Sequence, residues 1–316
     1  MARRRHRIAR RMAKEGWRVR VATRDPNAAL FVKPYGATGQ VEPVFCNIRD
    51  DASVSAVLNG ADAVVNCVGT FDATGKNNFD AIQHEGAARV ARLAKVAGVG
   101  RLVHISAIGA DVNAASEYAR TKGLGEAAVL ESFADAVILR PSVIFGTEDE
   151  FFNRFAAMAG MGPILPIVGA DSRFQPVYVD DVAAAAVMGV EGKAVGVYEL
   201  GGPDVQTMRE LMHTTLGVVQ RLSLVMNIPF WIAKIMATGF KVAQVCSLGI
   251  IKAPFTKDQI ANLRNDNVVA EGAQGFDALG IRPAAMGAIL PDYLWRFRPS
   301  GQYAEIKNSA KNLRNS

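Results

Sequence analysis

Tyr118 and Lys122 have the side-chain types and the spacing that most clearly suggest chemistry, within the segment Tyr-Ala-Arg-Thr-Lys. On a helix, residues four apart share a face, so the two side chains would lie side by side. An ammonium beside a phenol favours the phenolate and lowers the tyrosine pKa, which makes the phenol a usable general acid. The lysine could also hydrogen-bond a ribose. The spacing alone is weak evidence for a catalytic site, because tyrosine and lysine are both common on helices.

The elements around this pair follow an alternating pattern through about residue 200. Short, β-branched runs that are apolar on both sides alternate with helical stretches, as expected of parallel strands covered by helices on two faces. The expected strands are 18–23, 41–47, 63–68, 102–106 and 136–139, and the expected helices are 8–15, 52–58, 79–97 and 116–131. The pattern predicts an α/β fold with a doubly wound parallel sheet.

The character of the chain changes after residue 201. A helix is expected over 207–222, and the stretch 224–251 is rich in Ile, Met, Phe and Trp, with Lys234 and Lys241 on an amphipathic helix. Its apolar face could pack in the core, against a partner or on a membrane surface. We expect two domains: 1–200, which would carry the sheet, and 201–316, a small, mostly helical lobe with a basic, extended tail.

Charge is unevenly distributed over the 316 residues, whose net charge is +6. Residues 1–24 hold ten basic residues and one acid, whereas the remainder is net −3. Only Trp17 could stack on bases there, which disfavours nucleic acid. An anionic membrane face or an acidic partner fits better, and a solvated basic helix face fits as well. Three scattered cysteines predict neither a disulfide framework nor a metal site.

Further motifs accompany the tyrosine and the lysine. They are Asn-Cys-Val-Gly at 66–69, Arg-Pro-Ser-Val-Ile-Phe-Gly at 140–146 and Gln-Pro-Val-Tyr-Val-Asp-Asp-Val-Ala at 175–183. Together they resemble the short-chain dehydrogenase/reductase superfamily in its extended or atypical form. The resemblance implies a Rossmann-like fold with a nicotinamide dinucleotide site. The catalytic residues it implies are Tyr118, Lys122 and Ser106, and the cofactor-binding residues are Arg24, Asn47, Ile48, Cys67, Val68, Gly69, Ser106, Tyr118, Lys122, Pro141 and Val143.

Arg24 decides the expected cofactor, because it follows the second strand of the superfamily pattern. A cation there suits a 2′-phosphate, whereas proteins that use NAD generally carry an acid, so NADPH is expected. An ordinary exposed arginine explains the position equally well.

The chain departs from the superfamily pattern in two places. The first strand and its glycine-rich turn are absent before the helix 8–15, which would leave strand edges unpaired and remove the pyrophosphate contacts. Three explanations stand: a start assigned downstream of the true one, arginines that form an anion site, or an arginine-rich mitochondrial targeting segment. In addition, Ser106 falls one position early, which puts Ala107 at the catalytic serine position and costs the site a hydrogen-bond donor.

Two segments narrow the resemblance to one branch of the superfamily. They are Glu-Asp-Glu-Phe-Phe-Asn-Arg-Phe at 148–155 and Pro-Asp-Tyr-Leu-Trp-Arg-Phe-Arg-Pro at 291–299. They resemble the dehydrogenase-like accessory subunits of respiratory complex I (NADH:ubiquinone oxidoreductase) and their bacterial relatives. This implies a structural NADPH with little or no turnover and partners at the junction of the peripheral and membrane arms. It also implies contact with a membrane surface, on the cytoplasmic face of a bacterial inner membrane or the matrix side of the mitochondrial one.

Other functions and site residues remain open from the sequence. A soluble NADPH-dependent reductase, or a sugar-nucleotide epimerase or dehydratase, would use Tyr118 as acid with Lys122, and an NADPH sensor would bind a partner according to nucleotide. His104 reads as a satisfied core histidine and His84 as a helix residue near the cofactor. Asp180 and Asp181 read as caps of a helix that opens at Val182.

Overall fold

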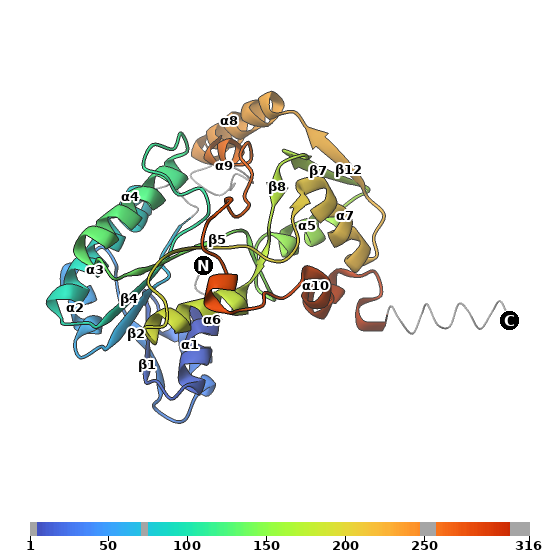
Figure 1. Cartoon of the computed structure of the whole chain (residues 1–316). Coiled ribbons are helices and arrows are strands. Elements are labelled where there is room, and N and C mark those ends of the chain that lie inside the picture. Colours follow the sequence, from blue (N-terminus) through green and yellow to red (C-terminus); the bar gives the residue numbers. More distant parts are fainter. Residues whose placement is uncertain (1–4, 71–74, 247–256, 304–316) are drawn as a thin grey trace. The chain divides into compact units, whose positions relative to one another are not determined.

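The computed structural model describes residues 5–70, 75–246 and 257–303, and it divides into two compact units (Figure 1). The first unit comprises Met1–Ser142, Val179–Gly201 and Val269–Pro283, and the second comprises Val143–Tyr178, Gly202–Val268 and Ala284–Ser316. The chain therefore passes between the units several times, whereas the sequence suggested one division near residue 200.

Parallel strands form the centre of the first unit. They are β1 (Val19–Thr23), β2 (Val41–Phe45), β3 (Ala63–Asn66), β4 (Arg101–Ile105), β5 (Val137–Pro141) and β10 (Gly196–Leu200). The strands β10-β5-β4-β3 form one four-stranded sheet in that order, and β1 pairs with β2 in a separate two-stranded sheet. The five expected strands are thus confirmed, with ends that differ by one or two residues.

The parallel strands of the first unit form two separate sheets. Among the described residues, β1 pairs only with β2 and β3 pairs only with β4. Most residues of both strands are half-buried rather than buried, unlike those of the fully paired β5. The predicted unpaired edges are therefore present on β1 and β3.

Helices cover both faces of the four-stranded sheet. The α-helices of the first unit are α1 (Arg5–Lys14), α2 (Asp51–Leu58), α3 (Glu85–Val96), α4 (Glu117–Ser132) and α6 (Val179–Val190). The unit also contains the 3-10 and π-helical segments η2 (Asn27–Tyr35), η3 (Gly75–Asn77), η4 (Asp80–His84) and η5 (Asp277–Leu279). Leu102 packs with residues of α2, α3 and α4, whereas Val103, the next residue along β4, lies against Gly189 of α6. Neighbouring strand residues point to opposite faces, so α3 and α4 lie on one side and α6 on the other (Figure 1).

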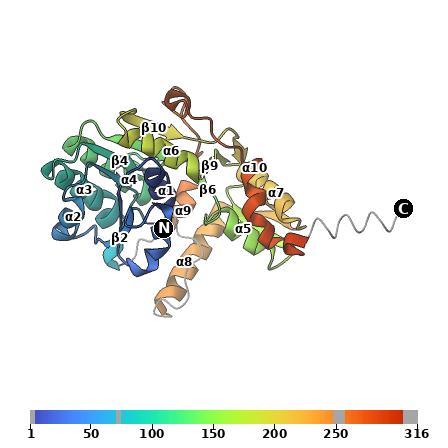
Figure 2. The ribbon, with the colours of Figure 1, turned by 90° about the horizontal axis from the view of Figure 1, so that it is seen from below.

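In its described residues, the second unit is mostly helical and has three short strand pairs. The helices are α5 (Phe152–Ala159), α7 (Met208–Val219), α8 (Phe230–Cys246), α9 (Lys257–Asn262) and α10 (Met286–Leu294), followed by the turns η6 (Trp295–Phe297) and η7 (Gly301–Tyr303). Figure 2 labels the helices α5, α7, α8, α9 and α10. The pairs are β6 (Ile144–Phe145) with β9 (Val177–Tyr178), β8 (Arg173–Phe174) with β11 (Gln206–Thr207), and β7 (Ile164–Val168) with β12 (Leu224–Ile228). Its core gathers apolar side chains of α5, α7, α10 and β7. α7 begins at a capping box of Thr207 and Glu210.

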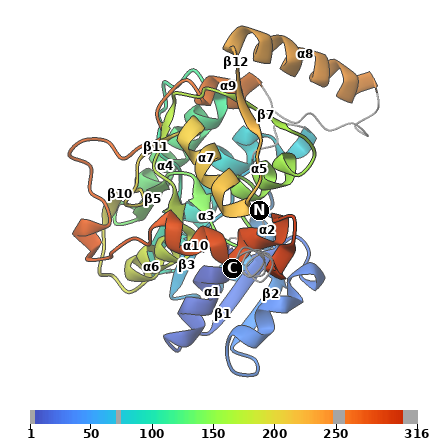
Figure 3. The same cartoon turned by 90° about the vertical axis from the view of Figure 1, so that its right-hand side faces the viewer.

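The helix expected over 224–251 is wrong at its start. Leu224–Ile228 pairs in parallel with Ile164–Val168, and α8 begins only at Phe230, after Pro229 (Figure 3). Exposed Leu224 and Met226 alternate with buried Val225, which is the two-residue period of a strand. The expected helix residues 247–251 lie outside the described residues, as do residues 304–316 of the expected tail. Within the described ranges, no helix is both long and apolar enough to cross a membrane.

Candidate dinucleotide site

α4 carries the tyrosine and the lysine on one face, as the spacing predicted. The Ser116 hydroxyl caps the helix by accepting a hydrogen bond from the Ala119 amide at 3.4 Å. Lys122 is buried, and its Nζ donates to the Ile105 carbonyl at the end of β4, at 3.0 Å. The half-buried Tyr118 ring meets the Phe79 ring edge to face, with centroids 5.9 Å apart. The lysine is thereby fixed at the carboxyl end of the sheet, where α/β proteins bind ligands.

Two glycines let α4 approach its neighbours closely. A Cβ on Gly125 would lie 2.2 Å from the Gln83 carbonyl oxygen in η4, and one on Gly123 would lie 2.6 Å from the backbone of Asp111. Neither contact is possible for a larger residue without a shift of the helix. These glycines therefore set the depth at which α4 holds Lys122, a role that the sequence analysis missed.

An ion-pair network ties α4 to the sheet. Arg140 of β5 donates from Nε and Nη2 to the Glu126 carboxylate of α4, at 3.0 and 2.6 Å, and lies 3.5 Å from Glu199 of β10. The hydrogen bond with Glu126 is the main cause that raises the Arg140 pKa. Glu199 in turn accepts from the Ala270 amide at 2.8 Å. The arginine of the Arg-Pro segment thus positions α4 rather than binding a ligand.

Burial sets the protonation of Lys122. Desolvation lowers its pKa to about 8, while the nearby charges of Glu126 and Cys67 act in the opposite direction. The ammonium is therefore the main form at neutral pH. One of its three donors is used by the Ile105 carbonyl.

Asn66 and His104, which face each other across β3 and β4, form a second buried contact. The Asn66 Oδ1 accepts from the Val68 amide at 3.1 Å, so its NH₂ group points to the His104 Nδ1 at 3.2 Å. His104 then carries its proton on Nε2, which has no hydrogen-bond partner among the described residues. Burial lowers the His104 pKa to about 3, and the Lys122 charge adds to this, so the imidazole stays neutral. The expected core histidine is buried, but only one of its nitrogens is satisfied.

Ser106 follows β4 directly and is 5% exposed. Its amide continues the ladder to the Leu139 carbonyl at 2.7 Å, while its buried Oγ has no hydrogen-bond partner within the described part of the chain. A buried hydroxyl without a partner costs free energy unless a ligand or water satisfies it. The Ser106 hydroxyl is therefore a candidate group at this edge for a hydrogen bond with a ligand or with water.

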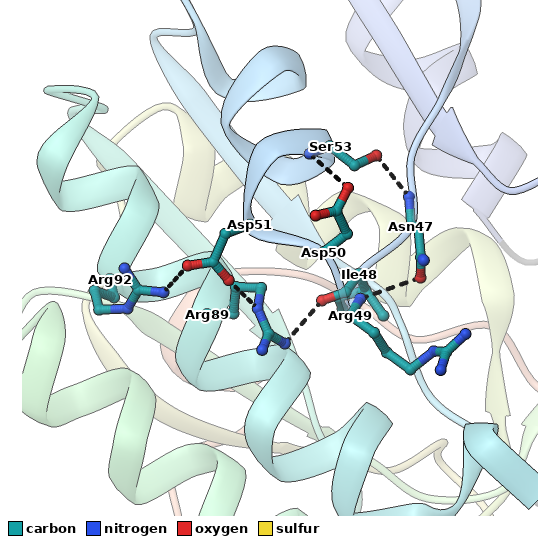
Figure 4. Close-up of polar contacts among 8 residues, drawn as sticks. All are labelled: Asn47, Ile48, Arg49, Asp50, Asp51, Ser53, Arg89 and Arg92. Atoms are coloured by element: carbon teal, nitrogen blue, oxygen red, sulfur yellow. Dashed lines mark hydrogen bonds and ion pairs between the residues drawn. The ribbon is translucent and has the colours of Figure 1, made fainter.

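The loop after β2 carries the predicted adenine residues (Figure 4). The Asn47 Oδ1 accepts from the Arg49 amide at 3.2 Å, and the Ile48 carbonyl accepts from Arg89 at 3.1 Å. Asp51 bridges Arg89 and Arg92, with its Arg92 contact at 2.5 Å. The Ile48 side chain is buried in the core of the first unit, so it contacts Gly86 rather than lining an open site.

Arg49 is a residue that the sequence analysis missed. Its side chain extends away from the Asp51 cluster (Figure 4), and its buried Nε has no hydrogen-bond partner among the residues described. A cation beside Asn47 could meet an anionic ligand at this loop. The sequence signal was only the Asn-Ile-Arg-Asp run after the strand.

The remaining predicted residues lie at several places. Arg24 is exposed directly after β1, beside Thr23, which lines a small pocket together with residues of α1 and η2. Cys67, Val68 and Gly69 form a half-buried loop after β3. Pro141 is buried at the end of β5, and its carbonyl accepts from the Ile108 amide at 3.1 Å. Val143 belongs to the second unit.

His84, Asp180 and Asp181 differ in part from their expected roles. His84 ends the π-helical turn η4 and its Nδ1 lies 2.9 Å from the Asp80 carboxylate. Asp180 and Asp181 lie inside the first turn of α6, because this helix begins at Val179 and not at Val182. Asp180 accepts two hydrogen bonds from Arg11 of α1, at 3.0 and 2.6 Å. No group of three or more potential metal ligands gathers within the described ranges.

The two segments that resemble one branch of the superfamily meet in the second unit. The Tyr293 hydroxyl donates to the Asp149 carboxylate at 2.5 Å, and Arg296 donates to the Asn153 side-chain oxygen at 2.6 Å. Burial raises the pKa of Asp149, and the same burial, with the Asp149 charge, raises the pKa of Tyr293. These two segments are therefore joined by polar contacts within the second unit.

The parallel sheet, with helices on both faces and polar groups at its carboxyl edge, has the Rossmann-like architecture that is typical of proteins that bind nicotinamide dinucleotides. An NAD(P)H-binding family model matches residues 6–160. The chain is 34% identical over 302 residues to the NADH dehydrogenase (ubiquinone) 1 alpha subcomplex subunit 9 of Arabidopsis thaliana, which covers 93% of this chain and 75% of that protein. The chain therefore belongs to the alpha subcomplex subunit 9 family.

Other comparisons agree with this assignment. The NADH-ubiquinone oxidoreductase 40 kDa subunit of Neurospora crassa is 28% identical, over 94% of this chain and 77% of that protein. Among solved structures, a dTDP-glucose 4,6-dehydratase from Streptomyces venezuelae with NAD bound has a TM-score of 0.69 at 20% identity, over 96% of this chain and 94% of that one. This last likeness concerns the fold alone.

Proposed function

We propose that the protein is an accessory subunit of respiratory complex I, which holds a nucleotide for structural reasons and turns it over little or not at all. The observation that carries the proposal is the 34% identity to a complex I subunit over 93% of the chain. The contacts between residues 148–155 and 291–299 support it, because the two segments that resemble complex I accessory subunits lie together in the fold.

Co-purification tests this assignment. The tagged chain would be expressed in its own source, the membranes solubilised in digitonin, and the complexes separated on a native gel. We expect the chain to migrate with NADH:quinone oxidoreductase activity and to be recovered with that complex in near-equal amounts. Recovery of all of the chain as a free protein, with the oxidoreductase intact elsewhere, would overturn the proposal.

The residues at the carboxyl edge fit the ribose and nicotinamide end of NADPH. The Lys122 ammonium and the Tyr118 hydroxyl are suited to ribose hydroxyls, and the buried Ser106 Oγ needs a partner that a ligand would supply. When bound, the nicotinamide could supply hydride chemistry. Ala107 follows Ser106 and offers no donor to a substrate carbonyl, which supports a holding role rather than turnover.

The preference for NADPH over NADH rests on Arg24. An exposed cation after β1 suits a 2′-phosphate, so the proposal predicts tighter binding of NADPH. Titration of the purified chain by nucleotide fluorescence would measure this, with Arg24→Ala expected to reduce the preference about tenfold, the loss of one charged contact. Arg20 is the matched control, because it lies four residues earlier, on β1, and donates to the Val57 and Asn59 carbonyls.

The rate of NADPH oxidation distinguishes a structural nucleotide from the cofactor of a reductase. We expect purified protein to oxidise bound NADPH negligibly with small carbonyl compounds. Rapid NADPH oxidation that Tyr118→Phe abolishes would replace the accessory role by an enzymatic one.

An exposed apolar surface on the second unit supports a peripheral position on a membrane, at the junction of the two arms. Trp231 and Ile235 are exposed on one face of α8, with exposed Lys234 between them, while Ala233 and Ala237 are buried on the opposite face. Residues 220–257 contain five basic residues and no acid. Apolar and aromatic groups flanked by lysines are typical of helices that lie on anionic lipid. The side of the membrane would be the matrix side or the bacterial cytoplasmic side.

A further inference from the structure

We propose that Cys67 is a reactive thiol at the nucleotide site, activated by Lys122, which soft electrophiles and peroxides modify and which a bound dinucleotide protects. The proposal rests on the nucleotide site proposed above and adds a modification site to it. It makes nucleotide occupancy and thiol modification mutually exclusive.

Strand register places the two residues together. Asn66 is the last residue of β3 and pairs with His104 of β4. Cys67 is the next residue after Asn66, and Ile105 is the next after His104, so both residues lie where β3 and β4 end side by side. The Ile105 carbonyl is the group that accepts the 3.0 Å hydrogen bond from the Lys122 Nζ. Cys67 and the ammonium therefore lie at the same carboxyl edge of the sheet, close enough for their charges to interact.

The polar contacts of Asn66 fix the start of the loop that carries Cys67. The Asn66 side chain bonds the Val68 amide and His104, so the residues before and after the cysteine are both held. Cys67 itself is half-buried and is not part of a disulfide. The thiol thus has a fixed position and partial access to solvent.

Electrostatics favour the thiolate at this position. The interaction of the Cys67 charge with Lys122 raises the Lys122 pKa, and by reciprocity the ammonium favours the thiolate. His104 is kept neutral by burial, so it adds no competing positive charge. Glu126 also interacts with Lys122, and its carboxylate is bound to Arg140.

Unsatisfied polar atoms next to this pair show that the edge is prepared for a ligand. Ser106 and His104 are at least nine-tenths buried, and their Oγ and Nε2 have no hydrogen-bond partner among the described residues. Both belong to the end of β4, adjacent to the carbonyl that holds Lys122. A dinucleotide that satisfied them would cover Cys67.

The chemistry is that of a thiolate nucleophile. With iodoacetamide, a sulfur–carbon bond forms, the carbon–iodine bond breaks and iodide leaves. With hydrogen peroxide, the sulfur attacks one oxygen and the oxygen–oxygen bond breaks. The departing hydroxide takes up a proton to become water, which leaves a cysteine sulfenic acid, oxidised by two electrons.

Alkylation rates measured by peptide mass spectrometry test the proposal on the full chain. At pH 7.0 with iodoacetamide, we expect Cys67 to react at least tenfold faster than Cys46, which is also half-buried in the first unit. Saturating NADPH should slow Cys67 at least tenfold and leave Cys46 unchanged. Protein alkylated at Cys67 should bind NADPH at least tenfold more weakly.

Variants separate the role of the ammonium from general accessibility. Lys122→Met should slow Cys67 about tenfold, because the thiolate would lose its neighbouring positive charge, whereas Lys122→Arg should retain most of the rate. Equal rates in the wild type and Lys122→Met, or a Cys67 rate no greater than that of Cys46, would overturn the activation. The comparison with Cys46 in the wild type decides this even if Lys122→Met does not fold.

The outcomes also distinguish this inference from the proposed nucleotide site. NADPH that binds without slowing Cys67 would overturn the protection while leaving the nucleotide site intact. Absence of NADPH binding, together with a fast, Lys122-dependent Cys67, would overturn both the protection and the nucleotide site and leave only the activated thiol.

Discussion

Single buried side chains decide the charge at the candidate site. The Tyr118–Lys122 spacing predicted that the two residues share a helix face, and α4 confirms this. The sequence could not predict that Lys122 is buried, nor that Asn66 would orient His104, because both depend on packing between strands far apart in the chain. The sequence therefore predicts the spacing of residues on one helix, but not the desolvation of a side chain that strands distant in the sequence bury.

The buried His104 predicts a pH dependence of stability. Its pKa is lowered from 6.5 to about 3 in the folded protein, so the unfolded chain binds the proton more readily between these values. The contribution of His104 is therefore complete above pH 6.5 and is lost as the pH falls towards 3, with a slope of up to about 1.4 kcal/mol per pH unit.

Urea unfolding between pH 4 and 7 measures this slope. We expect His104→Asn, whose side-chain amide can still meet Asn66, to be less stable at pH 7 but to show a flatter dependence on pH. His213→Asn, at an exposed position of α7, is the matched control. A slope unchanged by His104→Asn would show that other groups cause the acid sensitivity.

At the scale of elements, periodicity predicted the strands of the first unit to within one or two residues. It failed at β12, because the apolar residues 224–228 carry no sign in the sequence of their pairing with β7. It also gave no sign that Gly123 and Gly125 bring α4 against its neighbours, since a glycine in a helix has no visible partner in the sequence. Contacts between elements, rather than the elements themselves, were the missing information.

Gly125→Ala tests the packing of α4. The new Cβ would lie 2.2 Å from the Gln83 carbonyl oxygen, so helix and turn must separate. We expect a loss of about 1–3 kcal/mol in the free energy of unfolding, together with weaker NADPH binding because Lys122 moves with the helix.

The control for this change is Gly217→Ala on α7, where a Cβ would meet nothing within 4 Å. It should stabilise the protein by about 0.5–1 kcal/mol, since alanine favours helices. Chemical denaturation and nucleotide titration of the two variants give the comparison. Equal stability of Gly125→Ala and the wild type would mean that α4 does not depend on this close approach.

At the scale of the whole molecule, charge and apolar surface are distributed unequally along the chain. The basic excess of residues 1–24 was visible in the sequence, and so was the absence of acids from 220–257. The structure adds which described apolar side chains of the second region reach the surface: Leu222, Leu224, Met226, Trp231 and Ile235 are exposed. Exposed apolar residues in a stretch whose charged residues are all basic favour anionic lipid over neutral lipid.

Vesicle flotation tests this surface. The purified full chain should float with vesicles that contain phosphatidylglycerol and much less with pure phosphatidylcholine, because the lysines need anionic headgroups. The double variant Trp231→Ser and Ile235→Ser should lose most of the binding, since the apolar side chains of α8 would no longer enter the interface. Lys234→Glu should weaken binding to anionic vesicles several-fold, because it reverses one charge.

Val96→Ser is the matched control, since Val96 is an exposed apolar residue at the end of α3 in the first unit. It should float as the wild type does. If the α8 variants also float as the wild type does, α8 does not meet lipid. If they float normally but no longer co-purify with the oxidoreductase, the apolar face of α8 contacts a protein subunit instead.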